Sequence, residues 1–89
     1  MLQLTRAMAE AWSGQGVTCN AIAPGLFPTE LTEGLFQNPE LVQGMAARTC
    51  VGRNGDLPDI HGAVIYLASP AAAFVTGHTL FVDGGLTAK

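Results

Sequence analysis

The chain has 89 residues, a formal net charge of −3 and no run of basic residues. A nucleic-acid partner requires clustered Lys and Arg. The four basic residues here are scattered along the chain, so we expect no nucleic-acid partner. No apolar stretch approaches the roughly 20 residues of a membrane helix, so we also expect no membrane association.

Charged residues are scarce for a chain of this size. They make up 12% of the sequence and hydrophobic residues 48%, whereas an average soluble domain carries roughly twice that charged fraction. This balance predicts apolar surface that another protein surface covers, unless the abundant alanines merely inflate the apolar fraction. Cys19 and Cys50 have no metal-ligand spacing, and Arg6 and Glu10 interrupt any signal-peptide core. We therefore expect reduced thiols and a cytoplasmic location.

The first predicted elements are a helix and a strand. Over residues 2–13 apolar side chains recur at helical spacing: Leu4, Met8, Ala11 and Trp12. Glycines follow and stop the helix. Residues 17–23 form a short apolar run with β-branched members, which predicts a buried strand that ends at Pro24-Gly25.

The middle of the chain predicts two further helices. Asn38-Pro39-Glu40 is typical of a helix start, and the apolar residues that follow would face inward: Leu41, Val42, Met45 and Ala46. Asp56 is a candidate cap for a second helix, whose apolar face would carry Ile60, Val64, Leu67 and Ala68. Ser69-Pro70 ends that helix.

A second apolar strand is expected over residues 79–82, before the turn Asp83-Gly84-Gly85. The order helix, strand, helices, strand predicts an α/β fold with one βαβ unit in a single domain, 1–89. Two parallel strands are normally too few for a stable sheet. The pattern therefore indicates a piece of a larger parallel sheet.

Six short motifs, in this order, resemble the C-terminal part of the short-chain dehydrogenase/reductase family. They are Leu4-Thr5-Arg6, Asn20-Ala21-Ile22-Ala23-Pro24-Gly25 with Thr29, Gly52-Arg53, the segment 63–69, Phe74-Val75-Thr76-Gly77, and Val82-Asp83-Gly84-Gly85. The resemblance implies the C-terminal portion of a Rossmann-like doubly wound parallel sheet. Within the family, the chain looks most like gluconate and other sugar-acid dehydrogenases.

The resemblance also implies a cofactor, NAD or NADP, beside the Pro24-Gly25 turn. Ligands of open parallel sheets bind at the carboxyl ends of the strands, and a Pro-Gly turn lets the backbone approach a flat ring closely. In the family pattern Pro24, Gly25, Phe27 and Thr29 are the cofactor-binding residues. The backbone of Phe27 and the hydroxyl of Thr29 would hold the nicotinamide carboxamide. The alternative for Thr29 is a cap on the following turn, 30–36.

Residues 26–50 correspond in this resemblance to the family's substrate lid. Leu31, Leu35 and Phe36, with Phe27, would line the lid. The equally open alternative is that these side chains only pack the lid onto the sheet. Asn20 is expected to be structural, since a polar side chain in an apolar strand needs partners.

The sequence predicts no catalytic residue and no metal site within the chain. It contains no Gly-x-Gly-x-x-Gly loop for a pyrophosphate. The family's Tyr-x-x-x-Lys pair is also absent, because the only tyrosine is Tyr66 and Pro70 stands where the lysine would be. The residues for these tasks are expected to precede Met1. His61 and His78 lack nearby ligands at zinc spacing.

Two functional hypotheses follow from these observations. The first is the C-terminal segment of an NAD(P)-dependent oxidoreductase that acts on an alcohol or carbonyl substrate and is inactive alone. The second is a non-catalytic oligomerisation module derived from that family. In both, we expect a homo-oligomer formed through the surfaces of residues 2–13 and 60–82.

Overall fold

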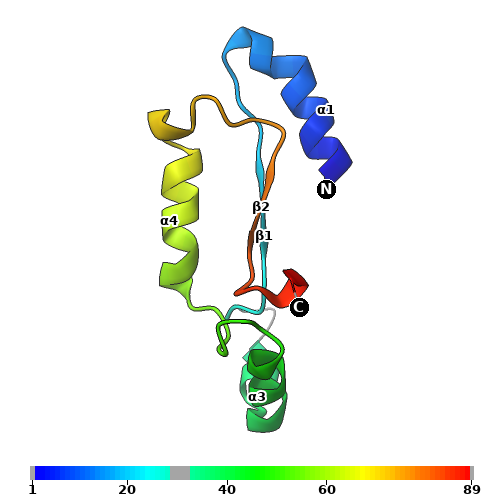
Figure 1. The fold of residues 1–89 in the computed structure, drawn as a ribbon, viewed down its shortest axis with the longest axis vertical. Helices are drawn as coiled ribbons and strands as arrows, with labels where there is room; N and C mark the ends of the chain where they lie inside the picture. The colour runs from blue at the N-terminus through cyan, green and yellow to red at the C-terminus, as the bar shows by residue number, and fades with distance from the viewer. Residues whose placement is uncertain (1, 29–32, 89) are drawn as a thin grey trace. The chain divides into compact units, whose positions relative to one another are not determined.

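The computed structural model describes residues 2–28 and 33–88 of the chain (Figure 1). The helices are α1 (Leu2–Trp12), α2 (Glu33–Phe36), α3 (Pro39–Ala47) and α4 (Leu57–Leu67), and the strands are β1 (Ala21–Pro24) and β2 (Thr79–Val82). Single 3₁₀ turns cover Ser13–Gln15, Pro70–Ala72 and Leu86–Ala88. Within these described ranges no helix is both long and apolar enough to span a bilayer.

The two strands form a parallel pair. The Ala21 amide donates to the His78 carbonyl at 2.9 Å, and the Gly25 amide donates to the Val82 carbonyl at 3.0 Å. A step of four residues along β1 is thus a step of four residues along β2 in the same direction, which is the parallel pattern. The predicted α/β class with a parallel sheet is confirmed. In the described residues the sheet has two strands, so each strand has an unpaired edge.

Contacts divide the chain into two compact units. The first unit comprises Met1–Ala23 and His61–Phe81, and the second comprises Pro24–Ile60 and Val82–Lys89. This division into two compact units does not decide whether residues 1–89 form a single domain, which stays a prediction. The candidate site of the sequence analysis, from Pro24 onward, belongs to the second unit.

In the first unit α1 lies along one side of the strands and the later part of α4 along the other (Figure 1). The predicted helix over 2–13 is confirmed as α1, and the 3₁₀ turn that follows it ends at Gly16, which has φ +88°. Glycine is the residue that adopts this left-handed conformation at little energetic cost. Helix α1 passes close to Gly77, where an added Cβ would lie 3.4 Å from the Ala9 Cβ.

The first strand is shorter than the sequence predicted. Residues 17–20 precede β1 because their backbone groups bond outside the ladder: the Cys19 amide donates to the Thr76 Oγ1 at 3.1 Å, and the Cys19 carbonyl accepts from the Gly77 amide at 2.7 Å. Asn20 has the structural role expected of it. Its Nδ2 donates to the Val75 carbonyl at 2.9 Å, and its Oδ1 accepts from the His78 amide at 3.1 Å.

In the second unit both predicted helix starts are confirmed. The Asn38 Oδ1 accepts from the amides of Glu40 and Leu41 at 3.1 and 3.4 Å, and Pro39 is the first residue of α3. At α4 the Asp56 Oδ1 accepts from the Leu57 amide at 2.9 Å, while Asp59 accepts from the Asp56 amide at 2.8 Å. These bonds satisfy amides that a helix leaves unpaired at its first turn.

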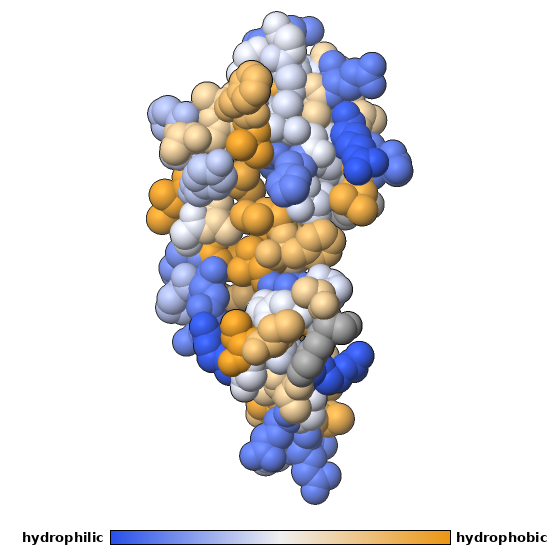
Figure 2. Space-filling view, in the orientation of Figure 1, coloured by the Kyte–Doolittle hydropathy of each residue, from blue (hydrophilic) through white to orange (hydrophobic). Residues whose placement is uncertain are grey.

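Few side chains are buried, and part of the predicted core is exposed. Among the described residues the buried apolar ones are Ala9, Phe27 and Ala72. Leu41 and Val64 were expected on inward apolar faces, yet they are 48% and 49% exposed, so the described residues cover those helix faces only in part. Figure 2 shows apolar residues open to solvent on one face of the molecule.

Candidate functional site

The turn that follows β1 lies against the residues that follow β2. Gly25 pairs with Val82 through the last bond of the ladder. A Cβ built on Gly25 would lie 3.0 Å from the Cα and 3.2 Å from the Cβ of Asp83. A larger residue at Gly25 would therefore push the two strand ends apart. The carboxyl ends of both strands meet here, which is the edge where open parallel sheets bind ligands.

Phe27 closes the turn on its other side. Its side chain is 7% exposed, and a Cβ added to Gly55 would lie 2.6 Å from two of its ring carbons. The Gly55 amide also donates to the Leu26 carbonyl at 2.9 Å. The turn after β1 is thus fixed by Gly55 through a backbone bond and through packing of the Phe27 ring.

A second turn, Asp83-Gly84-Gly85, supports the first. The Asp83 carboxylate accepts from the Gly85 amide at 3.0 Å and from the Thr87 hydroxyl at 2.7 Å. The hydrogen bond from Thr87 lowers the pKa of Asp83, because it favours the ionised carboxylate, and backbone bonds act in the same direction. Asp83 is therefore used as the anchor of a turn.

Gly84 and Gly85 both have left-handed backbones, with φ of +64° and +88°. The Gly84 carbonyl accepts from the amides of Cys50 and Val51 at 2.8 and 3.1 Å. A Cβ on Gly85 would lie 2.6 Å from the Cβ of Cys50. The Gly-Gly pair therefore connects the turn after β2 to Cys50, at the end of the predicted lid segment 26–50. The close approach requires residues without side chains.

The predicted lid segment, residues 26–50, contains α2 and α3, which pack on each other. Of the predicted lid residues, Phe36 is half-buried and Leu35 is 43% exposed. Leu31 and the predicted cofactor residue Thr29 lie outside the described residues. The structure thus brings Pro24, Gly25 and Phe27 together in one turn, and the roles of all the named site residues stay predictions.

The connection from α3 to α4 is also held by polar side chains. The Arg53 guanidinium makes two bonds to the Asp59 carboxylate, at 2.7 and 2.9 Å. The bond from Arg53 lowers the pKa of Asp59 to about 2, with help from the Asp56 amide. The sequence patterns did not indicate the roles of Gly55, Asp83 and Cys50, although the Gly-Gly pair after the strand was a usable signal.

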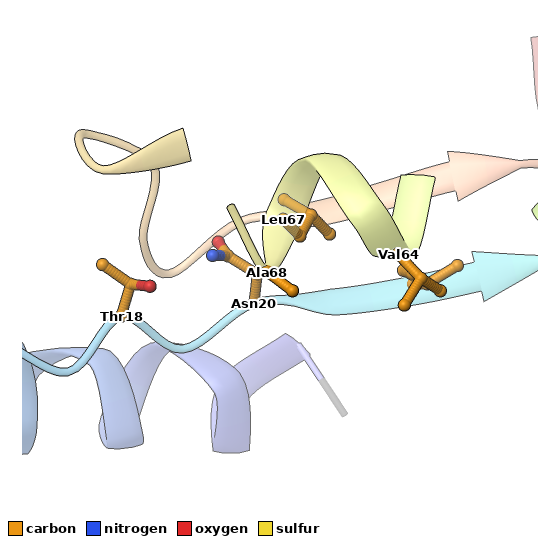
Figure 3. A pocket seen from close by; sticks show the side chains of 6 residues that line it. Thr18, Asn20, Val64, Leu67 and Ala68 are labelled. Carbon is orange, nitrogen blue, oxygen red and sulfur yellow. The ribbon is translucent and has the colours of Figure 1, made fainter. Parts of the chain in front are cut away.

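Two pockets occur elsewhere, in the first unit. One, of about 360 Å³, lies between the approach to β1 and helix α4 (Figure 3). Its lining residues are Thr18, Asn20, Ile22, Val64, Leu67 and Ala68. The other, of about 500 Å³, is lined by residues of the α4 end and of the approach to β2. Neither pocket is lined by a predicted cofactor or lid residue. In residues 2–28 and 33–88 no three His, Cys, Asp or Glu side chains gather as a metal site.

Comparisons with known proteins agree with this geometry. The family model described as enoyl-(acyl carrier protein) reductase matches residues 1–87. A galactitol 2-dehydrogenase (L-tagatose-forming) of Cereibacter sphaeroides is 49% identical over 85 residues, 96% of this chain and 34% of that protein. A gluconate 5-dehydrogenase of Gluconobacter oxydans is 43% identical over 84 residues, 94% of this chain and 33% of that protein.

Solved structures give the same result. The crystal structure of a gluconate 5-dehydrogenase from Burkholderia cenocepacia in complex with NADP and tartrate superposes with a TM-score of 0.94 and 43% identity. It covers 99% of this chain and 34% of that one. A 4-hydroxyisoleucine dehydrogenase complexed with NADH superposes with a TM-score of 0.91 at 36% identity, over 99% of this chain and 36% of that one. This chain thus spans about a third of the length of these relatives, and it belongs to the short-chain dehydrogenase/reductase family.

Proposed function

We propose that this chain supplies the nicotinamide-side turn and the substrate lid of an NAD(P)-dependent oxidoreductase acting on an alcohol or carbonyl of the sugar-acid class. The observation that carries the proposal is the turn Pro24–Phe27, held at the carboxyl ends of both parallel strands. In the family, relatives at 43% identity include a gluconate 5-dehydrogenase solved with NADP. The substrate class rests on these relatives alone.

Each residue of the turn has a task in this proposal. Pro24 is exposed at the strand end. Gly25 has no side chain, so a flat ring can approach the backbone closely there. The Phe27 ring is already packed against Gly55, so the backbone of Phe27 is the part assigned to the carboxamide. The Thr29 hydroxyl is the second contact in this assignment, unless it caps the next turn.

The lid residues Leu31, Leu35 and Phe36 would exclude water above the nicotinamide. Leu35 is 43% exposed, so it is available to contact a ligand without rearrangement of a core. An apolar lid strengthens the polar contacts beneath it, because those contacts then operate in a medium of lower dielectric constant.

NAD(P)(H), when bound, supplies or accepts the hydride. The hydroxyl proton needs a separate acid or base, and the only tyrosine, Tyr66, has no lysine four residues later. We therefore propose that the 89-residue chain binds and orients but does not reduce a carbonyl unaided. Turnover by the chain alone would refute that statement.

A chimera tests the proposal directly. Residues 1–89 would replace the matching third of the gluconate 5-dehydrogenase of Gluconobacter oxydans, and gluconate oxidation would be assayed with NAD and with NADP. We expect activity. Thr29→Val should raise the cofactor KM about 3- to 10-fold, the effect of one lost hydrogen bond. Thr18→Val, which changes an exposed threonine in the first unit, is the matched control and should leave KM unchanged.

A folded but inactive chimera would refute the proposed function. An active chimera whose cofactor KM ignores Thr29→Val would refute only the assignment of that hydroxyl. In that case the capping role of Thr29 would become the preferred one.

Exposed apolar side chains favour a second candidate, a non-catalytic assembly module. Four aromatic residues of the predicted interface segments, 2–13 and 60–82, are open to solvent: Trp12 at 44%, Tyr66 at 43%, Phe74 at 103% and Phe81 at 52%. Surfaces of this kind on a small protein mark sites that another protein covers. The same segments were expected to form a homo-oligomer.

Analytical ultracentrifugation of the 89-residue chain over a concentration series distinguishes the two candidates. A discrete dimer or tetramer that Phe74→Ser dissociates would support the assembly module. A folded monomer at every concentration would rule that module out and leave the enzyme-segment proposal standing.

A further inference from the structure

Two adjacent residues, Asn54 and Gly55, contact the lid helix and the cofactor-side turn at the same time. The Asn54 Nδ2 donates to the Val42 carbonyl in α3 at 2.9 Å. The next amide, that of Gly55, donates to the Leu26 carbonyl at 2.9 Å, and Gly55 also lies under the Phe27 ring. All of these residues belong to the second unit. A shift of this dipeptide therefore moves the lid and the turn together.

The loop that carries Asn54 is itself held in place. On one side Arg53 bonds twice to Asp59, and its Nη1 also donates to the Asn54 carbonyl at 3.1 Å. On the other side the Thr49 hydroxyl, which is largely buried, lies 3.2 Å from the Arg53 carbonyl and 2.8 Å from that of Ala46. With the backbone fixed in this way, the side chain of Asn54 adds a second connection from this loop to α3, at Val42, beside the bond from Thr49 to Ala46.

Among the described residues the Asn54 side-chain amide is bonded through its NH2 group and not through its oxygen. Its Oδ1 is buried and has no partner among the described residues. The amide orientation follows from the Val42 carbonyl, because only the NH2 group can donate to it. The unpaired buried oxygen costs free energy and so offsets part of the stabilisation from the bond between the NH2 group and Val42. That oxygen can bind water again when α3 moves away. A leucine would fill a similar volume with neither the bond to Val42 nor the unpaired oxygen.

We propose that Asn54 is a positioning residue that links the position of the lid helix α3, through Gly55, to that of the turn Pro24–Phe27 and releases α3 easily. It touches neither cofactor nor substrate in this role. We call this link from Asn54 to Val42 the latch. Its relevance to catalysis rests on the proposed function, whereas the latch itself is a property of the 89-residue chain and is testable without cofactor.

Amide hydrogen exchange on the 89-residue chain tests the latch. Asn54→Ala should speed exchange about 5- to 10-fold both in α3 and at Leu26 to Phe27, consistent with one lost hydrogen bond. Asn38→Ala is the matched control, because Asn38 also bonds to α3 but only at its first turn. It should speed exchange in that turn alone. Unchanged exchange in Asn54→Ala, or a uniform increase over the whole chain, would overturn the proposal.

Asn54→Leu separates positioning from a merely structural role. It removes the donor and the unpaired oxygen together, so we expect the midpoint of denaturant unfolding to be kept or raised while α3 exchange becomes faster. A structural role alone predicts that both change in the same sense, and that outcome would overturn the proposal.

A third measurement needs no variant. In the unaltered chain the Asn54 side-chain amide protons should exchange at least 10-fold slower than those of a free asparagine, since the group is bonded and half-buried. Exchange at the free rate would overturn the proposal. The chimera assay measures activity, whereas these experiments measure hydrogen exchange and unfolding. A failure of the proposed function can therefore be distinguished from a failure of the latch.

Discussion

The two compact units of the chain are stabilised by different kinds of contact. In the second unit, Pro24–Ile60 with Val82–Lys89, four glycines lie so close to other residues that an added Cβ would approach to 3.0 Å or less: Gly25, Gly55, Gly84 and Gly85. In the first unit, Met1–Ala23 with His61–Phe81, only Gly77 has such a neighbour within 4 Å, at 3.4 Å.

Exposed apolar side chains show the opposite distribution. Among residues 2–28 and 33–88, nine of the thirteen large exposed hydrophobic residues belong to the first unit, and Phe74 is fully open to solvent. The comparison shows that the turns of the second unit specify their own geometry through close backbone contacts and polar bonds. The first unit instead leaves apolar side chains of its helices open to solvent, and exposed apolar surface of this kind is typical of interaction sites.

The largest expected effect comes from Gly85→Ala. The residue combines φ +88° with a Cβ position 2.6 Å from the Cys50 Cβ and 2.7 Å from its Sγ. Backbone strain and overpacking together should lower the free energy of unfolding by about 2–4 kcal/mol. The measurement is denaturant unfolding followed by circular dichroism.

Gly16→Ala is the matched control in the first unit. Gly16 has the same φ of +88° but nothing within 4 Å of its Cβ position, so only the backbone term of about 1 kcal/mol remains. Equal losses for the two variants would mean that the close packing of the second unit does not contribute to stability.

A smaller effect is expected from Asn20→Ala. The side chain joins two backbone groups of the segment before β2, at Val75 and His78. Its removal breaks a part-buried bond to the Val75 carbonyl and an exposed bond to the His78 amide, and should cost about 2 kcal/mol. Asn38→Ala, which removes an exposed helix cap in the second unit, should cost about 1 kcal/mol. Thermal unfolding of the two variants side by side measures the difference, and the reverse order would contradict it.

The smallest effect concerns the exposed ion pair of Arg53 and Asp59. The pKa of Asp59 in the folded chain is about 2, below its ordinary value of 3.8. Because the folded pKa is depressed, the contribution of Asp59 to stability is full above pH 3.8 and is lost as the pH falls toward 2. Asp59→Asn should flatten that part of the stability profile, measured as the unfolding midpoint from pH 7 to 2.5. An unchanged acid slope would show that other carboxylates dominate it.

Sequence patterns located most of the regular elements, because the signals there are local. Asn38-Pro39-Glu40 and Asp56 gave correct helix starts, and the apolar run 79–82 coincides with β2. The strand over 17–23 was placed too early. Its first residues bond to Thr76 and Gly77, far along the chain, and no local pattern reports such partners.

Burial was predicted less well for the same reason. Leu41 and Val64 have helical apolar spacing, yet each is about half exposed. Periodicity identifies an apolar face, but only the arrangement of other elements decides whether that face is covered. The motif places Pro24, Gly25 and Phe27 in one turn, and their cofactor role stays a prediction. The packing of Phe27 on Gly55 was not foreseen.

By itself the sequence determined the family, the α/β class and the order of elements, since these depend on spacing, caps and turn residues within short windows. The tertiary structure decided the rest. It set the approach of Gly85 to Cys50, the bond from Asn54 to Val42 and the unpaired oxygen of that amide. These features join residues that are distant in sequence, and their energies depend on distances of a few tenths of an ångström that no composition or periodicity encodes.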